Sequence, residues 1–97
     1  ELAAARMAIA HHFMIGVTGP ITFHNANALR GVISQVPLEN ILIETDAPFL
    51  APHPKRGERN EPALVKLVAE KLAELFHLPL ATVAEQTSSN ARRVFQW

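Results

Sequence analysis

The chain contains no cysteine, which excludes disulfide bridges and cysteine-ligated zinc or iron–sulfur sites. The lack of cysteine also fits a reducing compartment, and we predict a cytoplasmic protein. No apolar run approaches the roughly 20 residues that span a bilayer, so we expect no membrane partner. An excess of charge is missing too, because Lys+Arg and Asp+Glu both number 9. This balance argues against coating nucleic acid through bulk charge, while a local phosphate contact remains open.

The amino-acid composition of the chain is that of an ordinary globular protein. The 97 residues are 48% hydrophobic and 19% charged, enough for one small domain with a marginal core. The first residues, 1–7, are rich in alanine and leucine and resemble the middle of a helix, without an initiator Met or a signal-peptide layout. We therefore expect a truncated chain.

Hydrophobic patterning predicts helices that alternate with strands. The expected order is a helix over 1–11, a buried strand over Phe13–Gly19, a helix over Ala26–Gln35 capped by Asn25, a strand over Ile41–Ile43, a loop over Ala47–Asn60, a helix capped by Asn60 that extends to Phe76, and one or two helices ending near Phe95. Alternating βα units imply a parallel sheet. Two strands cannot close a barrel, which typically needs roughly 250 residues.

The most informative motif follows the second predicted strand. Glu44 and Asp46 would point to the same face of an extended segment, since side chains alternate along a strand. Parallel sheets of α/β proteins carry their chemistry at this end of their strands. Two carboxylates there require a cationic partner, which a metal ion, an arginine or a proton could supply. In the alternative interpretation, Asp46 caps a turn and Glu44 pairs with Arg56 or Arg59.

A basic segment, residues 55–62, precedes the next predicted helix. Arg56 lies beside Gly57 and could bind a phosphate through both guanidinium nitrogens. The start of a helix also favours an anion. The alternative is a solvated loop whose charges cancel one another.

We interpret most of the histidines and the C-terminal segment as structural. His11 and His12 lie at the end of the sheet opposite Asp46, and His77 ends a helix. His24 and His53 lie in loops on the Asp46 side and could contact substrate, although neither has a ligand partner at recognisable spacing. Residues 92 and 93 are arginines in the last helical turn, where positive charge interacts favourably with the helix dipole. Residues 94 and 95 are expected to anchor this helix.

Taken together, the motifs resemble the TatD family of metal-dependent deoxyribonucleases. The matching pieces are Gly19 with Thr22-Phe23 and Asn25-Ala26, Pro37-Leu38, the block Ile41 to Pro52 (ILIETDAPFLAP), Arg56-Gly57, Asn60-Glu61-Pro62 and Asn90 to Phe95 (NARRVF). They occur in one order over essentially the whole chain.

This resemblance implies an α/β fold of the TIM type, a (β/α)8 barrel, of which residues 1–97 are a C-terminal fragment without the other strands. It also implies hydrolysis of phosphodiester bonds in DNA with divalent metal ions, Mg²⁺ or similar. On that template Asp46 binds metal and helps to activate the attacking water, and Glu44 orients Asp46 or a basic neighbour. Arg56 and Asn60 hold the substrate loop or touch phosphate.

The chain departs from the family pattern in its missing ligands. The family's His-x-His pair, its Glu and two further His residues are absent, and Lys55 stands where a His often precedes the Arg-Gly pair. One carboxylate cannot hold a catalytic metal, so we expect these 97 residues to be inactive alone. Two alternatives remain: a non-catalytic fragment that self-associates through exposed strand edges or acts as a binding module, and an amidohydrolase acting on amides or esters.

Overall fold

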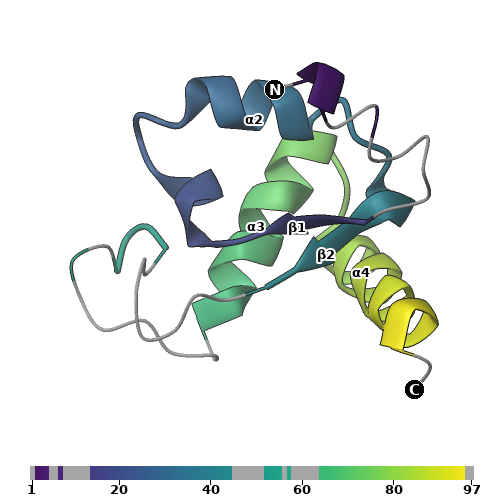
Figure 1. The fold of residues 1–97 in the computed structure, drawn as a ribbon. Helices are drawn as coiled ribbons and strands as arrows, with labels where there is room; N and C mark the ends of the chain where they lie inside the picture. The colour runs from purple at the N-terminus through teal and green to yellow at the C-terminus, as the bar shows by residue number, and fades with distance from the viewer. Residues whose placement is uncertain are drawn as a thin grey trace.

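Among the described residues, two short parallel strands lie in front of helix α3 (Val65–Phe76), and helix α2 (Asn27–Ile33) runs above them (Figure 1). The computed structural model describes residues 2–4, 7, 14–44, 52–55, 57 and 64–95. Strand β1 (Ile15–Val17) and strand β2 (Ile41–Ile43) pair in parallel, with Ile15 opposite Ile41 and Val17 opposite Ile43. Helix α2 (Asn27–Ile33) connects them, as a parallel crossover requires. The predicted βα order and parallel pairing are therefore confirmed.

The first strand is shorter than predicted. Only Ile15–Val17 form the strand, and a 3-10 helix, η1 (Gly19–Thr22), begins where the prediction still had strand. The physical reason is Pro20 in the first turn of η1, since proline cannot donate to a strand ladder but is well placed at a helix start. Phe13 lies outside the described residues.

The predicted cap of α2 is wrong. Ala26, not Asn25, occupies the N-cap position, and no side chain caps this helix. Arg30 instead ties the helix to the preceding loop, because its guanidinium donates to the carbonyl of Phe23 and to Oδ1 of Asn27. As a donor only, it does not cap the first amides of the helix. The helix ends at Ile33, two residues before the predicted end.

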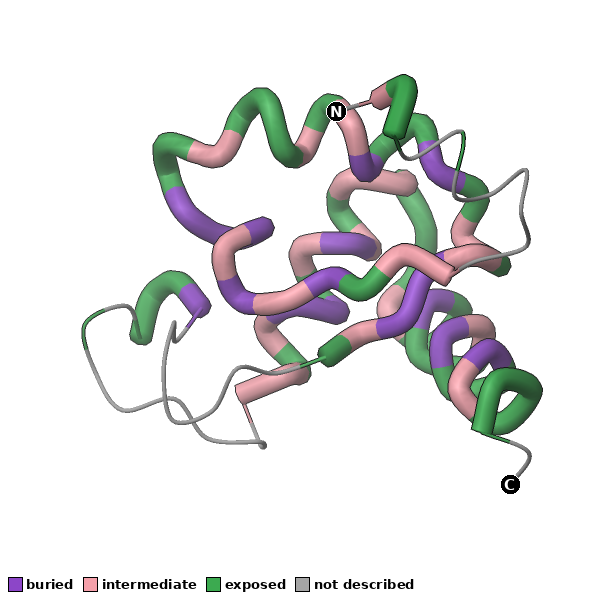
Figure 2. The backbone as a smooth tube through the Cα atoms, in the orientation of Figure 1, coloured by how far each residue is buried: buried purple, intermediate pink, exposed green. Residues whose placement is uncertain are grey.

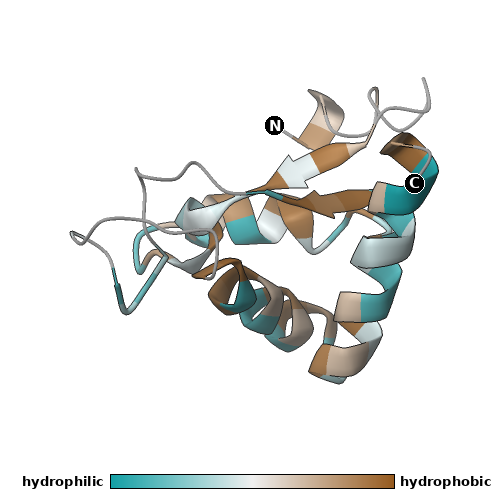
Figure 3. Cartoon of the chain, turned by 90° about the horizontal axis from the view of Figure 1, so that it is seen from below, coloured by the Kyte–Doolittle hydropathy of each residue, from teal (hydrophilic) through white to brown (hydrophobic). Residues whose placement is uncertain are grey.

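The core lies on one face of the two strands. Val17 and Ile41 pack there with Ile21, Ile33, Val36, Val68, Leu72 and Val83. Helix α3 (Val65–Phe76) presents Val68 and Leu72 to this cluster at helical spacing, as predicted. Figure 3 shows α3 and the start of helix α4 (Leu80–Phe95) on one side of the strands, and Figure 2 shows buried segments on both strands and on both of these helices.

A left-handed residue and a proline separate α3 from α4. His77 ends α3 with a φ of 54°, and its backbone amide bonds the carbonyl of Glu74, which confirms the structural role predicted for it. Pro79 precedes α4, a single helix over the region where one or two were expected. Within the described residues, no helix is both long enough and apolar enough to cross a membrane.

Polar contacts, and not the apolar residues predicted for that role, hold the C-terminal end of α4. Val94 and Phe95 are 41% and 55% exposed, so the prediction that they anchor the helix is wrong. Asn90 is buried instead and donates from Nδ2 to the carbonyls of Leu38 and Ile41, at 2.9 and 2.8 Å. These two carbonyls belong to β2 and to the short 3-10 helix η2 (Leu38–Asn40) before it. Buried Asn90 therefore ties α4 to the start of the second strand.

Candidate functional site

Both strands end at the same edge of the sheet. They run in parallel, and the ladder continues one residue further because the Glu44 amide donates to the Val17 carbonyl at 2.8 Å. The loops that follow each strand therefore start side by side. In parallel α/β folds this edge carries the reactive groups.

The Glu44 side chain lies on the sheet face opposite the core. Ile41 and Ile43 contact the core cluster, so the alternation along the strand turns Leu42 and Glu44 the other way. Gly16, which pairs with Leu42, shares that face. The Glu44 carboxylate lies directly over Gly16, since an ideal Cβ on Gly16 would be 2.6 Å from Glu44 Oε2. Glu44 was expected to point toward the inside of a barrel. That direction corresponds to the sheet face that is turned away from the helices.

The other predicted site residues fall on segments outside the described residues. These are Asp46, Arg56 and Asn60, together with Arg59, the alternative partner of Glu44. Gly57, beside Arg56, is described and has a φ of 91°, a conformation that glycine adopts without strain. Asp46 keeps its place in the sequence, two residues beyond Glu44.

Two histidines come together from the loops after the two strands. The rings of His24 and His53 meet edge to face, with centroids 4.4 Å apart and an interplanar angle of 67°. His24 follows η1, and His53 lies in the turn Pro52–Lys55, which the Lys55 amide closes on the Pro52 carbonyl at 2.7 Å. The sequence placed both residues on this side of the sheet but gave no sign that they touch.

Thr22 links the same two loops, and sequence reasoning missed this function. Its Oγ1 accepts a hydrogen bond from the His53 amide at 2.6 Å and donates to the Gly19 carbonyl at 2.7 Å. Thr22 is buried, and its bond to the Gly19 carbonyl is buried as well, whereas the bond from the His53 amide is part-buried. Arg30 was missed as well, although an arginine one turn into a helix is a recognisable partner for the preceding loop carbonyls.

The described residues do not form a metal centre by themselves. Within the described ranges, no three His, Cys, Asp or Glu side chains gather as metal ligands would. Glu44 is an exposed carboxylate at a strand end and suits a hard cation, but one such group is too few. No chemical step through a bound metal follows from these residues alone.

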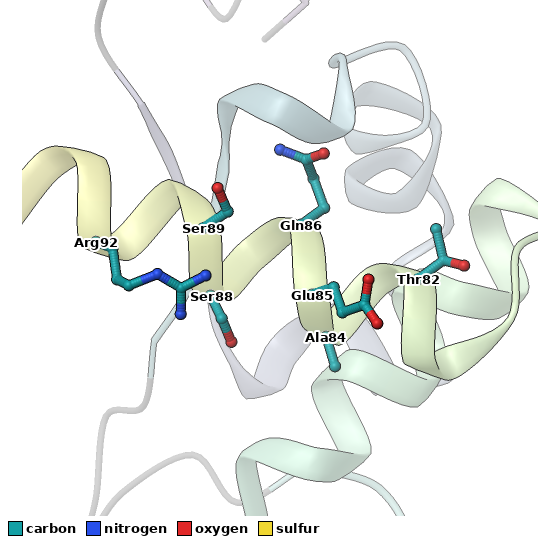
Figure 4. Close-up of a pocket in the computed structure, with 7 residues that line it drawn as sticks. All are labelled: Thr82, Ala84, Glu85, Gln86, Ser88, Ser89 and Arg92. Atoms are coloured by element: carbon teal, nitrogen blue, oxygen red, sulfur yellow. The ribbon is translucent and has the colours of Figure 1, made fainter.

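A shallow hollow lies elsewhere, on the outer face of α4 (Figure 4). All its lining residues come from that helix: Thr82, Ala84, Glu85, Gln86, Ser88, Ser89 and Arg92. None belongs to the loops that follow the strands. The hollow is therefore separate from the candidate site.

Comparisons of this sequence with a family model and with known proteins agree with one another. The family model described as "TatD related DNase" matches residues 1–96. The chain is 46% identical over 92 residues to the Bacillus subtilis protein named "Uncharacterized metal-dependent hydrolase YabD", covering 95% of this chain and 36% of that protein. It is 45% identical over 83 residues to Escherichia coli YcfH, which carries the same description, covering 86% of this chain and 31% of that protein.

Solved structures agree on the fold. The crystal structure of YjjV, a TatD homologue from Escherichia coli, superposes with a TM-score of 0.86 at 33% identity, covering 95% of this chain and 36% of that one. A TatD-family hydrolase from Entamoeba histolytica gives a TM-score of 0.81 over 94% of this chain and 38% of that one. At 21% identity the second likeness bears on the fold alone. The predicted fold class, C-terminal βα units of an incomplete TIM-type barrel, is confirmed.

Proposed function

The chain belongs to the TatD-related DNase family, and from this premise we propose that it supplies the last βα units of a metal-dependent hydrolase that cleaves phosphodiester bonds in DNA. The names of its relatives support a metal-dependent hydrolase. The chain spans about a third of their length, so most of the catalytic residues would come from the rest of the barrel.

One observation carries the proposal. The two strands end together, and the Glu44 carboxylate lies just beyond β2 on the face turned away from the helices. In a (β/α)8 barrel the helices form the outer layer, so the face turned away from them is the barrel interior. Glu44 would then line the mouth of the barrel at the end where such enzymes carry their chemistry.

The individual roles follow from residue chemistry. Asp46 would contribute one carboxylate oxygen to a divalent metal ion, and Glu44 would orient Asp46 or a basic neighbour. Arg56 would bind a phosphate oxygen, with Asn60 holding the same loop in place. A divalent ion such as Mg²⁺ supplies a more acidic bound water and polarises the phosphoryl oxygen.

Hydrolysis of short labelled DNA tests the proposal. The complete protein that carries this chain should cleave DNA with Mg²⁺ or Mn²⁺ and lose the activity with EDTA. Asp46→Asn should abolish cleavage while the melting temperature stays the same, since the motif follows a strand end. Full activity in Asp46→Asn would show that the site is misassigned.

Two controls sharpen this assay. The 97 residues alone should be inactive under the same conditions, and metal-dependent cleavage by them would refute the incomplete-site argument. Arg56→Lys should raise KM more than it lowers kcat, because lysine keeps the charge but loses two-point phosphate binding. A simple ester or amide substrate should not be turned over, which separates a nuclease from an amidohydrolase.

Self-association of the 97 residues is a second candidate function, favoured by one observation. Among the described residues the sheet has two strands only, so each has one edge without a strand neighbour. Unprotected edges promote pairing between chains. Sedimentation of the isolated chain would reveal dimers or larger species, and a monomer at all concentrations would exclude this function. A cytoplasmic location also remains a proposal, to be tested by cell fractionation.

A further inference from the structure

The His24–His53 pair has a feature that the proposed hydrolase does not use. Two imidazoles from separate loops, 29 positions apart in the sequence, meet with their centroids at 4.4 Å. Both side chains are exposed, so burial does not force this contact. The arrangement therefore depends on the backbones that carry the two rings.

Each backbone is held by its own hydrogen bonds. The His53 amide donates to buried Thr22 Oγ1 at 2.6 Å. On the other side, the Arg30 guanidinium donates to the carbonyls of Phe23 and His24, and Asn27 Oδ1 accepts a further bond from Arg30. The chain thus fixes both attachment points of the pair before any ligand arrives, which reduces the entropic cost of binding.

The ring nitrogens of both histidines could act as ligands. Among the hydrogen bonds formed within the described part of the chain, none involves a ring nitrogen of His24 or His53; those at these residues use backbone atoms only. An imidazole nitrogen without a protein partner is a good ligand for zinc, copper or nickel and a poor one for magnesium or calcium.

We propose that His24 and His53 form a binding site for a transition-metal dication of the Zn²⁺, Ni²⁺ or Cu²⁺ class at the edge where the strands end. With Zn–N bonds of about 2.0–2.1 Å, two imidazoles on one tetrahedral ion have centroids about 5 Å apart. The observed 4.4 Å is close to this value. Because the rings now meet edge to face, one ring would have to turn about χ2 to bring both nitrogens to a common point.

The ligands of this site differ from those assigned to the proposed hydrolase. The proposed catalytic metal uses oxygen from Asp46, whereas this cation would use nitrogen from the two loops. Its other coordination positions would face solvent and could take water or a phosphate oxygen. The inference does not depend on hydrolytic activity, so it stands or falls separately from the proposed function.

Titration of the untagged 97-residue chain with zinc tests the site. Calorimetry and the imidazole proton signals in NMR are the two readouts of this titration. A background of Asp46→Asn, His11→Gln and His12→Gln removes three further candidate ligands. In this background Zn²⁺ should bind with one-to-one stoichiometry and shift the signals of His24 and His53 together. Mg²⁺ at the same concentration should shift neither.

Single substitutions decide between a shared site and separate surface binding. His24→Ala and His53→Ala should each weaken Zn²⁺ binding at least about tenfold, since even an outer partner of a metal ligand is worth roughly 10- to 100-fold in affinity. His77→Asn is the matched control, because asparagine tolerates the left-handed conformation at this helix end, and it should leave affinity unchanged.

Three results of the zinc titration would overturn the proposal. These are zinc binding that survives both single substitutions, binding that depends on His77, or no zinc-induced shift of either ring at millimolar Zn²⁺. Copper offers an independent measurement, because Cu²⁺ bound here should show two nitrogen ligands in its electron paramagnetic resonance spectrum, and one after either substitution. A single nitrogen in the unsubstituted pair would also refute a shared site.

Discussion

The Glu44 carboxylate fills the space that a side chain on Gly16 would occupy, on the sheet face opposite the core. A Cβ on Gly16 would lie 2.6 Å from Oε2 of Glu44, closer than real Cβ atoms come to other atoms, and 3.0 Å from its Cδ. The missing side chain of Gly16 is therefore what allows the Glu44 carboxylate to lie across the neighbouring strand. A residue on β1 thus sets the position of a carboxylate that follows β2.

Gly16→Ala should displace the Glu44 carboxylate without unfolding the chain. The obstructing atoms are the end of an exposed, flexible side chain, and glycine itself weakens a strand. We expect the free energy of unfolding to change by no more than about 1 kcal/mol, as measured by urea denaturation. In the complete hydrolase, the same substitution should lower kcat as much as Glu44→Gln does.

Gly31→Ala is the matched control for that experiment. A Cβ at Gly31 would meet nothing within 4 Å, and the residue is exposed in α2. It should stabilise the chain by about 0.5–1 kcal/mol and leave kcat unchanged. If Gly16→Ala left hydrolysis unaffected while Glu44→Gln abolished it, the placement of Glu44 over Gly16 would have no functional importance.

Asn90→Ala should destabilise the chain by about 2–4 kcal/mol, because the carbonyls of Leu38 and Ile41 would lose their donor inside the protein. Such a loss is a large fraction of the stability of a small domain. Urea denaturation of Asn90→Ala beside exposed Ser89→Ala measures it. Equal midpoints for the two variants would contradict the structural role of Asn90.

Leu72→Ala should cost about 2–5 kcal/mol, since Leu72 is fully buried in the core between the strands and the helices. Leu29→Ala, at a position 39% exposed, should change stability by no more than about 0.5 kcal/mol. Thermal melts of both variants give the comparison. Similar melting temperatures would mean that the core is not packed as described.

Thr22→Val should release the loop that carries His53. Valine has nearly the same shape but neither accepts from the His53 amide nor donates to the Gly19 carbonyl, at a cost of about 1–3 kcal/mol. Amide hydrogen exchange at His53 should become faster, and ring contacts between His24 and His53 should disappear from NMR spectra. Thr82→Val, at an exposed position of α4, should change neither.

Periodicity and residue type in the sequence were enough to predict the parallel βα order, the buried face of α3 and the helix end at His77. These features depend on a few neighbouring residues, as strand alternation, helical spacing and turn chemistry all do. The motif around Glu44 and Asp46 was recognisable for the same reason, since both carboxylates lie within three residues.

Other features depended on partners far away in the sequence. Asn90 was recognised as part of a motif, but its donors go to carbonyls 52 and 49 positions earlier, and local patterning cannot specify them. Val94 and Phe95 were predicted as anchors because they are apolar, yet the core is already filled by residues from other elements.

The sequence by itself determined the order of strands and helices, the family and the identity of the candidate site residues. Only the tertiary structure decided that Glu44 lies over Gly16, that Thr22 holds the His53 loop and that His24 meets His53. The physical reason is that parallel pairing of β1 and β2 brings their following loops to one edge. Contacts between those loops depend on side-chain shape and hydrogen bonds across the pair, which no local pattern encodes.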